Sequence, residues 1–327
     1  NCPESQDKLE IFGIRIEYLS AQCVIKANQD LHNVTVLLDP LKHVSLSTYI
    51  PADAFEWNFV GSIPIDENTP KYRKTDLIRT APAKFPDYLA EDREMFLKKG
   101  DYKTVYLTIK IPRNADAGYY KGAVSIQTDE AEISLPLSLN VYPLTLPDER
   151  HLMVTEWFNT GNFRKFHNVD DYDSERFYEM LRLYAENMAE HRQNVFRVSL
   201  SLITCLQAFD GTLKFDFSKF DKWADIFWET GRMDLLETGF VARFGEGGWA
   251  SNEILLRDFR AQQESTGKRI TVPGKKYLRQ FLPALENHLR EKEWLDKTVF
   301  HIADEPSNHN VMSWRQASEY VHQYAPA

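Results

Sequence analysis

Two acidic residues stand side by side near the end of the chain, in the hexapeptide HIADEP (residues 301–306), which follows an apolar, β-branched run. Neighbouring strand residues point to opposite faces, so Asp304 and Glu305 can converge on one ligand only where the strand ends and the backbone turns. Pro306 favours such a turn. Two close carboxylates ionise unequally, which lets one donate a proton while the other stays anionic. The alternative is that Asp304 caps or precedes the next helix, Glu305 is solvated and Pro306 only ends the strand.

Further polar and aromatic residues fall at the ends of predicted strands. Glu156 and Trp157 end the first strand and Arg243 ends the third. Trp157 suits stacking on a sugar face, and core packing is its alternative. Arg197 alternates into the second strand and is expected to point inward, where an ion pair with Glu156 or Asp304 would be a purely structural role.

Two more candidates flank the acidic pair in the expected fold. The glycines of RFGEGGWAS, residues 243–251, predict a mobile loop after the third strand, and Trp249 in that loop is a second stacking candidate beside an ordinary packing role. His301 precedes Asp304 by three residues. It is expected to orient the ligand beside the acidic pair, unless it is a hydrogen-bonded histidine of the core.

The second half of the chain reads as strands alternating with helices. The predicted strands are His151–Phe158, Asn194–Leu200, Glu237–Phe244 and Lys297–Asp304. An apolar stripe behind a Ser174 cap predicts one amphipathic helix, a stripe interrupted at Pro283 predicts another, and a third surrounds Trp314. Successive βα units of this kind predict a (β/α) barrel, whose active site lies at the carboxyl ends of the strands.

The first half has a different texture. Residues 1–145 show short alternating runs separated by turn residues, which predicts an all-β sandwich. The segment 111–126 is interpreted as a hairpin, and the polar stretch 65–101 as a long connection. A proline-bracketed linker follows, and residues 146–327 form the predicted barrel domain.

Composition narrows the functional classes. The 48 acidic residues outnumber the 39 basic ones, and a net charge of −9 disfavours nucleic acid and anionic lipid as partners. No apolar run reaches the length of a membrane span. The three cysteines (Cys2, Cys23 and Cys205) are too few and scattered for a zinc cluster, although a Cys2–Cys23 bridge stays open. The common metal, phosphate and nucleophile motifs do not occur, so no metal or other cofactor is expected.

The first residue is Asn1 rather than Met. A removed secretory signal would explain it and would place the protein outside the cell, in the periplasm or on the cell surface. A removed affinity tag or a trimmed sequence explains the same observation.

Adjacent acids suit one particular glycosidase chemistry. Ordinary retaining glycosidases need two carboxyl groups on opposite sides of the scissile bond, about 5 Å apart. Sequence neighbours instead suit hydrolysis of 2-acetamido sugars, in which the acetamido oxygen attacks the anomeric carbon, one carboxylate stabilises the oxazolinium and its neighbour protonates the leaving oxygen.

The HIADEP motif, preceded by FLPALENHLREKEWLDKTVF and followed by SWRQASEYVHQYAP, resembles family 123 glycoside hydrolases, the β-N-acetylgalactosaminidases. The segment YAENMAEHRQNVFRVSL is also similar to the region of their second barrel strand. The resemblance implies a β-sandwich followed by a (β/α)8 barrel, with Asp304 as oxazolinium stabiliser and Glu305 as general acid and base. The competing function is a carbohydrate-binding or assembly protein with an inactive barrel.

The chain departs from that pattern in length. A closed barrel needs about 250 residues and eight strands, whereas residues 151–327 hold four predicted strands. Half a barrel would leave open edges, which a partner chain is expected to cover. In the family, later strands supply further sugar-binding aromatic residues. The sequence therefore predicts a fragment, or a relative that depends on another subunit.

Overall fold

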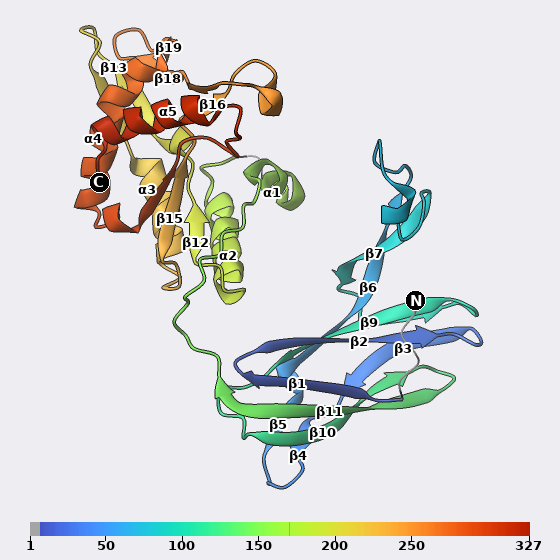
Figure 1. Ribbon diagram of the computed structural model, residues 1–327. Coiled ribbons are helices and arrows are strands. Elements are labelled where there is room, and N and C mark those ends of the chain that lie inside the picture. Colours follow the sequence, from blue (N-terminus) through green and yellow to red (C-terminus); the bar gives the residue numbers. More distant parts are fainter. Residues whose placement is uncertain (1–6, 170) are drawn as a thin grey trace. The chain divides into compact units, whose positions relative to one another are not determined.

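The computed structural model describes residues 7–169 and 171–327. They form two compact units, the first ending at Asp148 and the second beginning at Glu149 (Figure 1). Each unit has its own hydrophobic core. Cys2, one half of the candidate bridge to Cys23, lies outside the described residues.

Two β-sheets make up the first unit. One has the order β1-β11-β10-β3-β8, and β4 pairs with both β10 and β5. Its strands are β1 (Leu9–Arg15), β3 (Leu31–Leu38), β4 (Leu41–His43), β5 (Tyr49–Ile50), β8 (Met95–Leu97), β10 (Gly118–Gln127) and β11 (Glu132–Thr145). The other has the order β2-β9-β6-β7, with β2 (Tyr18–Lys26), β6 (Phe55–Ile65), β7 (Ala83–Ala90) and β9 (Tyr102–Lys110). Short 3-10 helices lie at Ala52–Ala54 and Lys74–Asp76.

Alternation along the strands builds the core of this unit. Val105, Leu107 and Ile109 of β9 are buried at every second position, and so are Leu137 and Leu139 of β11. Successive strand residues point to opposite faces, so each sheet turns one apolar face inward. Both sheets contribute to the same core, and they lie as two layers in Figure 1.

Two sequence-based expectations for this unit are wrong. The segment 65–101 is not a plain connection, because it contains β7, which pairs with β6, and β8, which pairs with β3. The expected hairpin at 111–126 is also absent, since β9 and β10 belong to different sheets. Turn residues mark where the chain reverses, but they do not tell whether the next strand returns to the same sheet.

A parallel sheet lies at the centre of the second unit. Its order is β12-β15-β20, with β12 (Val195–Arg197), β15 (Leu235–Gly239) and β20 (Thr298–His301). Thr155 adds a single parallel bridge to Val195. The predicted first strand is therefore reduced to one bridge, and the third ends at Gly239 rather than Phe244. Beyond Gly239 the chain leaves the sheet, and β16 (Ala242–Phe244) pairs with β17 (Ile254–Leu256).

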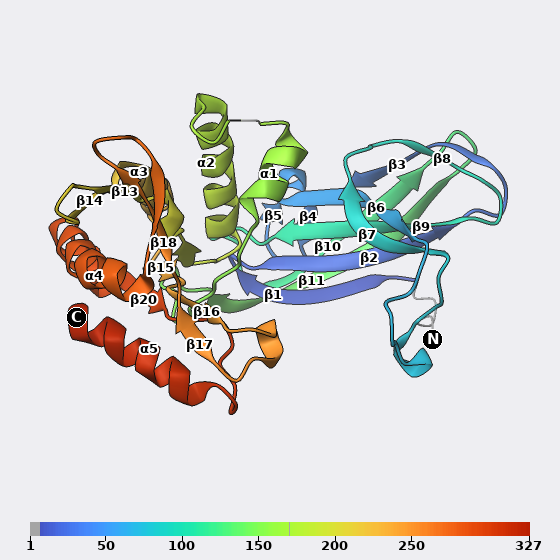
Figure 2. The ribbon, with the colours of Figure 1, turned by 90° about the horizontal axis from the view of Figure 1, so that it is seen from above.

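Helices share one hydrophobic core with this sheet. They are α1 (Thr160–His167), α2 (Glu175–Glu190), α3 (Ser218–Trp228), α4 (Gly274–Glu291) and α5 (Val311–Tyr324), with 3-10 helices at Leu200–Leu202, Gly248–Ala250 and Leu295–Lys297. The predicted Ser174 cap is confirmed, since its hydroxyl accepts a hydrogen bond from the Phe177 N–H at 3.2 Å. Phe196 of β12 stacks on Phe227 of α3, with ring centroids 4.8 Å apart. Helices α4 and α5 contact each other beside β20 (Figure 2).

A second, mixed sheet in this unit was not predicted from the sequence: its outer pairs are antiparallel and its central pair, β13–β18, is parallel. Its order is β14-β13-β18-β19, with β13 (Thr204–Gln207), β14 (Leu213–Asp216), β18 (Phe259–Gln263) and β19 (Arg269–Val272). Its first two strands lie between β12 and α3 in the sequence, and its last two lie between β17 and α4. Among the described helices, none combines the length and the apolar character needed to cross a membrane.

Candidate active site

Strand alternation selects which side chains share one face of the parallel sheet. Arg197 is the register partner of Glu237, and Glu237 is the partner of Val299. His301 follows Val299 by two residues and so shares its face. Phe196 points the other way, into the helical layer, where it is buried. Arg197, Glu237 and His301 therefore lie on the same face of the sheet. This placement agrees with the inward direction expected for Arg197.

Glu237 is a buried carboxylate at the centre of this face, with only 2% of its surface exposed. Its Oε2 accepts a hydrogen bond from the Thr155 hydroxyl at 2.8 Å. Its Oε1 lies 3.0 Å from His301 Nε2, which is ion-pair distance, although the contact does not have the geometry of a hydrogen bond. The carboxylate thus links segments 155, 237 and 301. Glu237 was missed from the sequence because the third strand was expected to begin at this residue. The strand begins two residues earlier, at Leu235, so Glu237 lies in its middle.

Aromatic rings surround the Arg197 guanidinium. Its central carbon lies 4.3 Å from the centroid of Trp157 and 4.9 Å from that of Phe240. His301 lies at the edge of the same group, with ring centroids 4.9 Å from Phe240 and 6.0 Å from Trp157. The structure thus brings together three predicted site residues, Trp157, Arg197 and His301. Phe240 was missed, although an aromatic residue directly after a strand-ending glycine was the available signal.

A cavity of about 390 Å³ opens beside these residues. Glu156, Trp157 and Arg197 all line it, together with Ser199 and Ser201. No ion pair joins Arg197 to Glu156 or Asp304 within the described residues, so the purely structural role considered for this arginine is not observed.

The two acids of HIADEP lie just beyond the parallel sheet. Strand β20 ends at His301, and the backbone bends through residues 302–305. Asp304 is half-buried and Glu305 is exposed. Glu305 has a φ of +34°, a left-handed conformation that strains a residue with a side chain. Neither carboxylate accepts a hydrogen bond or forms an ion pair with any residue that the structure describes.

Asp304 does not cap the following helix, although it precedes that helix and Glu305 is exposed, as the structural alternative expected. Helix α5 begins at Val311, and Asn310 precedes it. The Asn310 side chain is buried, with 1% exposed, and serves a different purpose. Its Oδ1 accepts from the Ser307 N–H at 2.8 Å, and its Nδ2 donates to the Ser251 carbonyl at 3.1 Å. Asn310 therefore ties the turn after the acidic pair to the segment that follows Trp249, a link that no sequence signal indicated.

Arg243 and Trp249 lie outside the parallel sheet. Arg243 is exposed on β16, and its guanidinium donates to the Phe244 carbonyl at 3.1 Å. Trp249 is 63% exposed, and its ring centroid lies 5.1 Å from that of Phe244. Arg243 does not end the third strand as predicted, because that strand stops at Gly239. The segment that carries these two residues is joined to the acidic turn by the Ser251–Asn310 hydrogen bond, not by the parallel sheet.

Other reactive groups offer little competing chemistry. In the described ranges, no group of three or more His, Cys, Asp or Glu side chains is placed to hold a metal ion. Burial raises the pKa of the Cys205 thiol to about 11, so this thiol is protonated near neutral pH and is a poor nucleophile.

Comparison with known families shows to which protein family the chain belongs. Residues 157–327, more than half of the chain, match the catalytic domain of glycoside hydrolase 123. The chain belongs to glycoside hydrolase family 123. Residues 2–128 match the N-terminal domain of the same family, so the resemblance seen in HIADEP is confirmed. No curated protein matches the sequence.

Among solved structures, the fold is similar to a family 123 glycoside hydrolase from Clostridium perfringens, described in a study of glycolipid glycan hydrolysis. The TM-score is 0.78 at 18% sequence identity, covering 96% of this family 123 chain. The chain spans 56% of the length of that relative. The PapD-like domain of human CEP192 (13% identity) and the CooA pilin subunit from enterotoxigenic Escherichia coli (12%) each cover 43% of this chain, and 84% and 91% of their own. Their TM-scores of 0.23 and 0.22 are too low to support an argument.

Proposed function

We propose that this protein is a glycosidase that cleaves β-linked 2-acetamido sugars, with N-acetylgalactosaminides preferred, by substrate-assisted hydrolysis. The observation that carries the proposal is the adjacent pair Asp304 and Glu305, which have no polar partner among the described residues and lie directly beyond the carboxyl end of β20. Membership of family 123 supports glycan hydrolysis as the reaction class.

The two acids take different steps. The acetamido oxygen of the sugar attacks the anomeric carbon as the bond to the leaving oxygen breaks, and Glu305 gives that oxygen its proton. Asp304 accepts the acetamido N–H and balances the positive charge of the oxazolinium. Water then attacks the anomeric carbon and breaks its bond to the acetamido oxygen, which opens the oxazolinium ring. Glu305 takes a proton from that water. The exposed position of Glu305 suits proton exchange with solvent, and the half-buried position of Asp304 suits charge stabilisation.

The remaining candidates are assigned to sugar binding. Trp157 and Trp249 offer exposed ring faces for stacking, at 47% and 63% exposure. Glu156 and Arg197 line the cavity beside the strand ends. His301, three residues before Asp304, lies at ion-pair distance from Glu237. Arg243 is assigned to the outer rim of the site, near Trp249.

Turnover of aryl glycosides tests the reaction class and the sugar together. The aryl 2-acetamido-β-galactoside is compared with the 2-acetamido-β-glucoside and with the plain β-galactoside. Because the acetamido group is the nucleophile, the plain galactoside should not be cleaved, and a thiazoline analogue of the acetamido sugar should inhibit. Cleavage of the plain galactoside, or a covalent sugar adduct on either acid, would overturn the mechanism. Glycan binding without turnover would favour the carbohydrate-binding alternative.

A further inference from the structure

The Arg197 guanidinium is a cation packed against aromatic rings, with no hydrogen-bond acceptor in residues 7–169 and 171–327. Two aromatic centroids lie 4.3 and 4.9 Å from its central carbon. Guanidinium groups carry five N–H donors in one plane, and a ring packed over the plane leaves those donors available at its edge. No hydrogen bond or ion pair joins this group to any described residue. The side chain is half-buried, so leaving it unpaired has a cost that a ligand would relieve.

The cavity beside Arg197 has polar groups on part of its wall. The Ser199 and Ser201 hydroxyls, which share a hydrogen bond of 2.8 Å, lie there with Thr160 and Tyr172, and apolar side chains such as Phe196 and Trp223 line much of the remainder. Hydroxyl groups donate to oxygen acceptors, and the planar fork of arginine matches two oxygens of one sulfate or carboxylate. A volume of about 390 Å³ is ample for such a group together with part of a sugar ring.

One acidic side chain of the cavity opposes the binding of an anion. Glu156 lines the same cavity, is exposed, and makes no ion pair with Arg197. A like charge would weaken the binding of an anion there, so Glu156 gives the inference a second test of opposite sign.

We propose that Arg197 is a specificity-determining residue that binds an anionic group of the glycan, either a sulfate ester or the carboxylate of a uronic acid. The inference rests on the proposed glycosidase function for the reaction, and it adds the substrate class: acidic glycans containing 2-acetamido sugars. The two aromatic rings hold the guanidinium in position, and the serine hydroxyls complete the binding site.

The test compares the aryl 2-acetamido-β-galactoside with its 4-O- and 6-O-sulfates and with a disaccharide glycoside that carries a neighbouring uronic acid. Wild-type protein should prefer an anionic substrate in kcat/KM by about 10- to 100-fold, the range that a charge-assisted hydrogen bond supplies. The sulfated and uronate arms identify which anion the site takes. Added salt should reduce the preference.

Substitutions test whether Arg197 causes the preference for an anionic substrate. Arg197→Met keeps an apolar stem against the rings and should abolish the preference, while Arg197→Lys should keep part of it, since the charge remains without the fork. Glu156→Gln should increase it. Arg182→Met, at an exposed position on α2, is the matched control and should leave it unchanged. Equal losses on neutral and anionic substrates in Arg197→Met, or no preference in the wild type, would overturn the inference.

Binding separates this inference from the proposed reaction. Calorimetry with the methyl glycosides, sulfated and neutral, needs no turnover. Tighter binding of the sulfated sugar that is lost in Arg197→Met supports the anionic site even if no glycoside is cleaved, which would count against the hydrolase proposal alone. Equal affinities for the two sugars would overturn the anionic site.

Discussion

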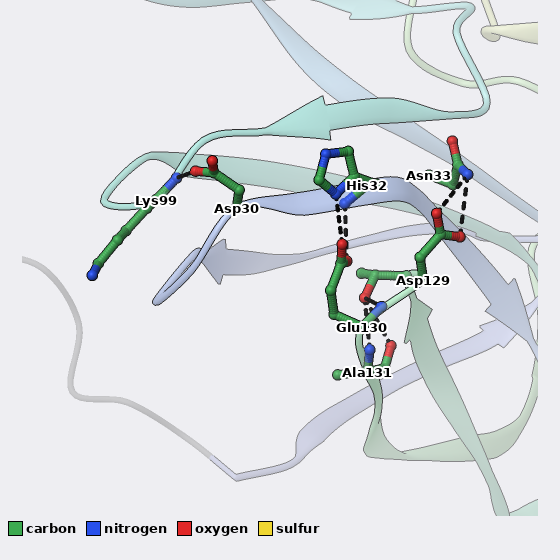
Figure 3. A network of polar contacts seen from close by, with 8 residues as sticks. Asp30, His32, Asn33, Lys99, Asp129, Glu130 and Ala131 are labelled. Carbon is green, nitrogen blue, oxygen red and sulfur yellow. Dashed lines mark hydrogen bonds and ion pairs between the residues drawn. The ribbon is translucent and has the colours of Figure 1, made fainter.

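Two polar regions of the molecule use similar residue types in opposite ways. At the turns of the first unit, His32 contacts Glu130 at 2.6 Å and Asn33 donates to Asp129 (Figure 3). Asp30 accepts from the Lys99 backbone N–H in the same network. Each of these groups has a partner from another turn, so the network joins strand ends. In the second unit, Asp304, Glu305 and Arg197 have no polar partner among the described residues.

The difference indicates where a ligand is expected. A satisfied network stabilises the fold and leaves little hydrogen-bonding capacity for anything else. Unsatisfied charged groups near strand ends contribute little to stability and keep their full capacity for a ligand. The comparison predicts that changes at the acids affect activity, whereas changes at the satisfied groups affect stability.

The largest effect is expected at the acidic pair. Asp304→Asn should lower kcat by about 100- to 1,000-fold on every substrate, because an amide cannot balance the oxazolinium charge. Glu305→Gln should lose about 100- to 10,000-fold on a natural disaccharide but far less on an activated aryl glycoside, whose leaving group needs little protonation.

Steady-state kinetics on both substrates and thermal melts check this expectation. Since neither carboxylate has a polar partner in the described part of the chain, both variants should melt at or slightly above the wild-type temperature. A large loss of stability in either one would show that the acids support the fold, and it would remove the contrast with the first unit.

An intermediate effect is expected at Asn310, the buried link between the acidic turn and the Trp249 segment. Asn310→Ala leaves the Ser307 N–H and the Ser251 carbonyl without partners, which should cost about 1 to 3 kcal/mol of unfolding free energy. Exposed Asn308→Ala is the matched control, with little expected change. Denaturant melts measure both, and hydrogen exchange should show faster opening at residues 248–254 and 304–307 in Asn310→Ala alone.

The smallest effect is expected at the His32–Glu130 pair. The hydrogen bond that the His32 ring donates to the Glu130 carboxylate raises the pKa of His32 above its ordinary 6.5, and the same bond lowers the pKa of Glu130 below 4.5. The histidine contribution is full below pH 6.5 and is lost as pH rises through the raised pKa. The glutamate contribution is full above pH 4.5 and is lost as pH falls through the lowered pKa. Stability from the pair should therefore be greatest between about pH 4.5 and 6.5.

Thermal melts of wild type and His32→Gln across pH 4 to 8 measure this contribution, and the difference between them should shrink above neutral pH. Both groups are exposed, so the shift should be small. A difference that grows with pH would have the wrong sign for this pair.

Several local features of the second unit could be predicted from the sequence. The Ser174 cap and the apolar stripe of α2 depend on residues within a few turns of one another, and the structure confirms them. The DEP turn likewise follows an apolar strand, which placed Asp304 and Glu305 near a strand end. The match to family 123 confirms the relationship that this motif suggested.

Contacts between distant segments decided the rest. Whether β10 returned to the sheet of β9 depended on pairing across the core, which turn residues do not encode. Glu237 acquired its role from Thr155 and His301, 82 and 64 positions away, and Arg197 acquired aromatic neighbours from two other strand ends. Side-chain periodicity and local backbone preference were enough to predict α2, α4 and α5, the Ser174 cap and the turn that carries the acidic pair. Only the tertiary structure decided which charged groups were satisfied and which were left for a ligand, because partners separated by dozens of residues meet only when the strands align.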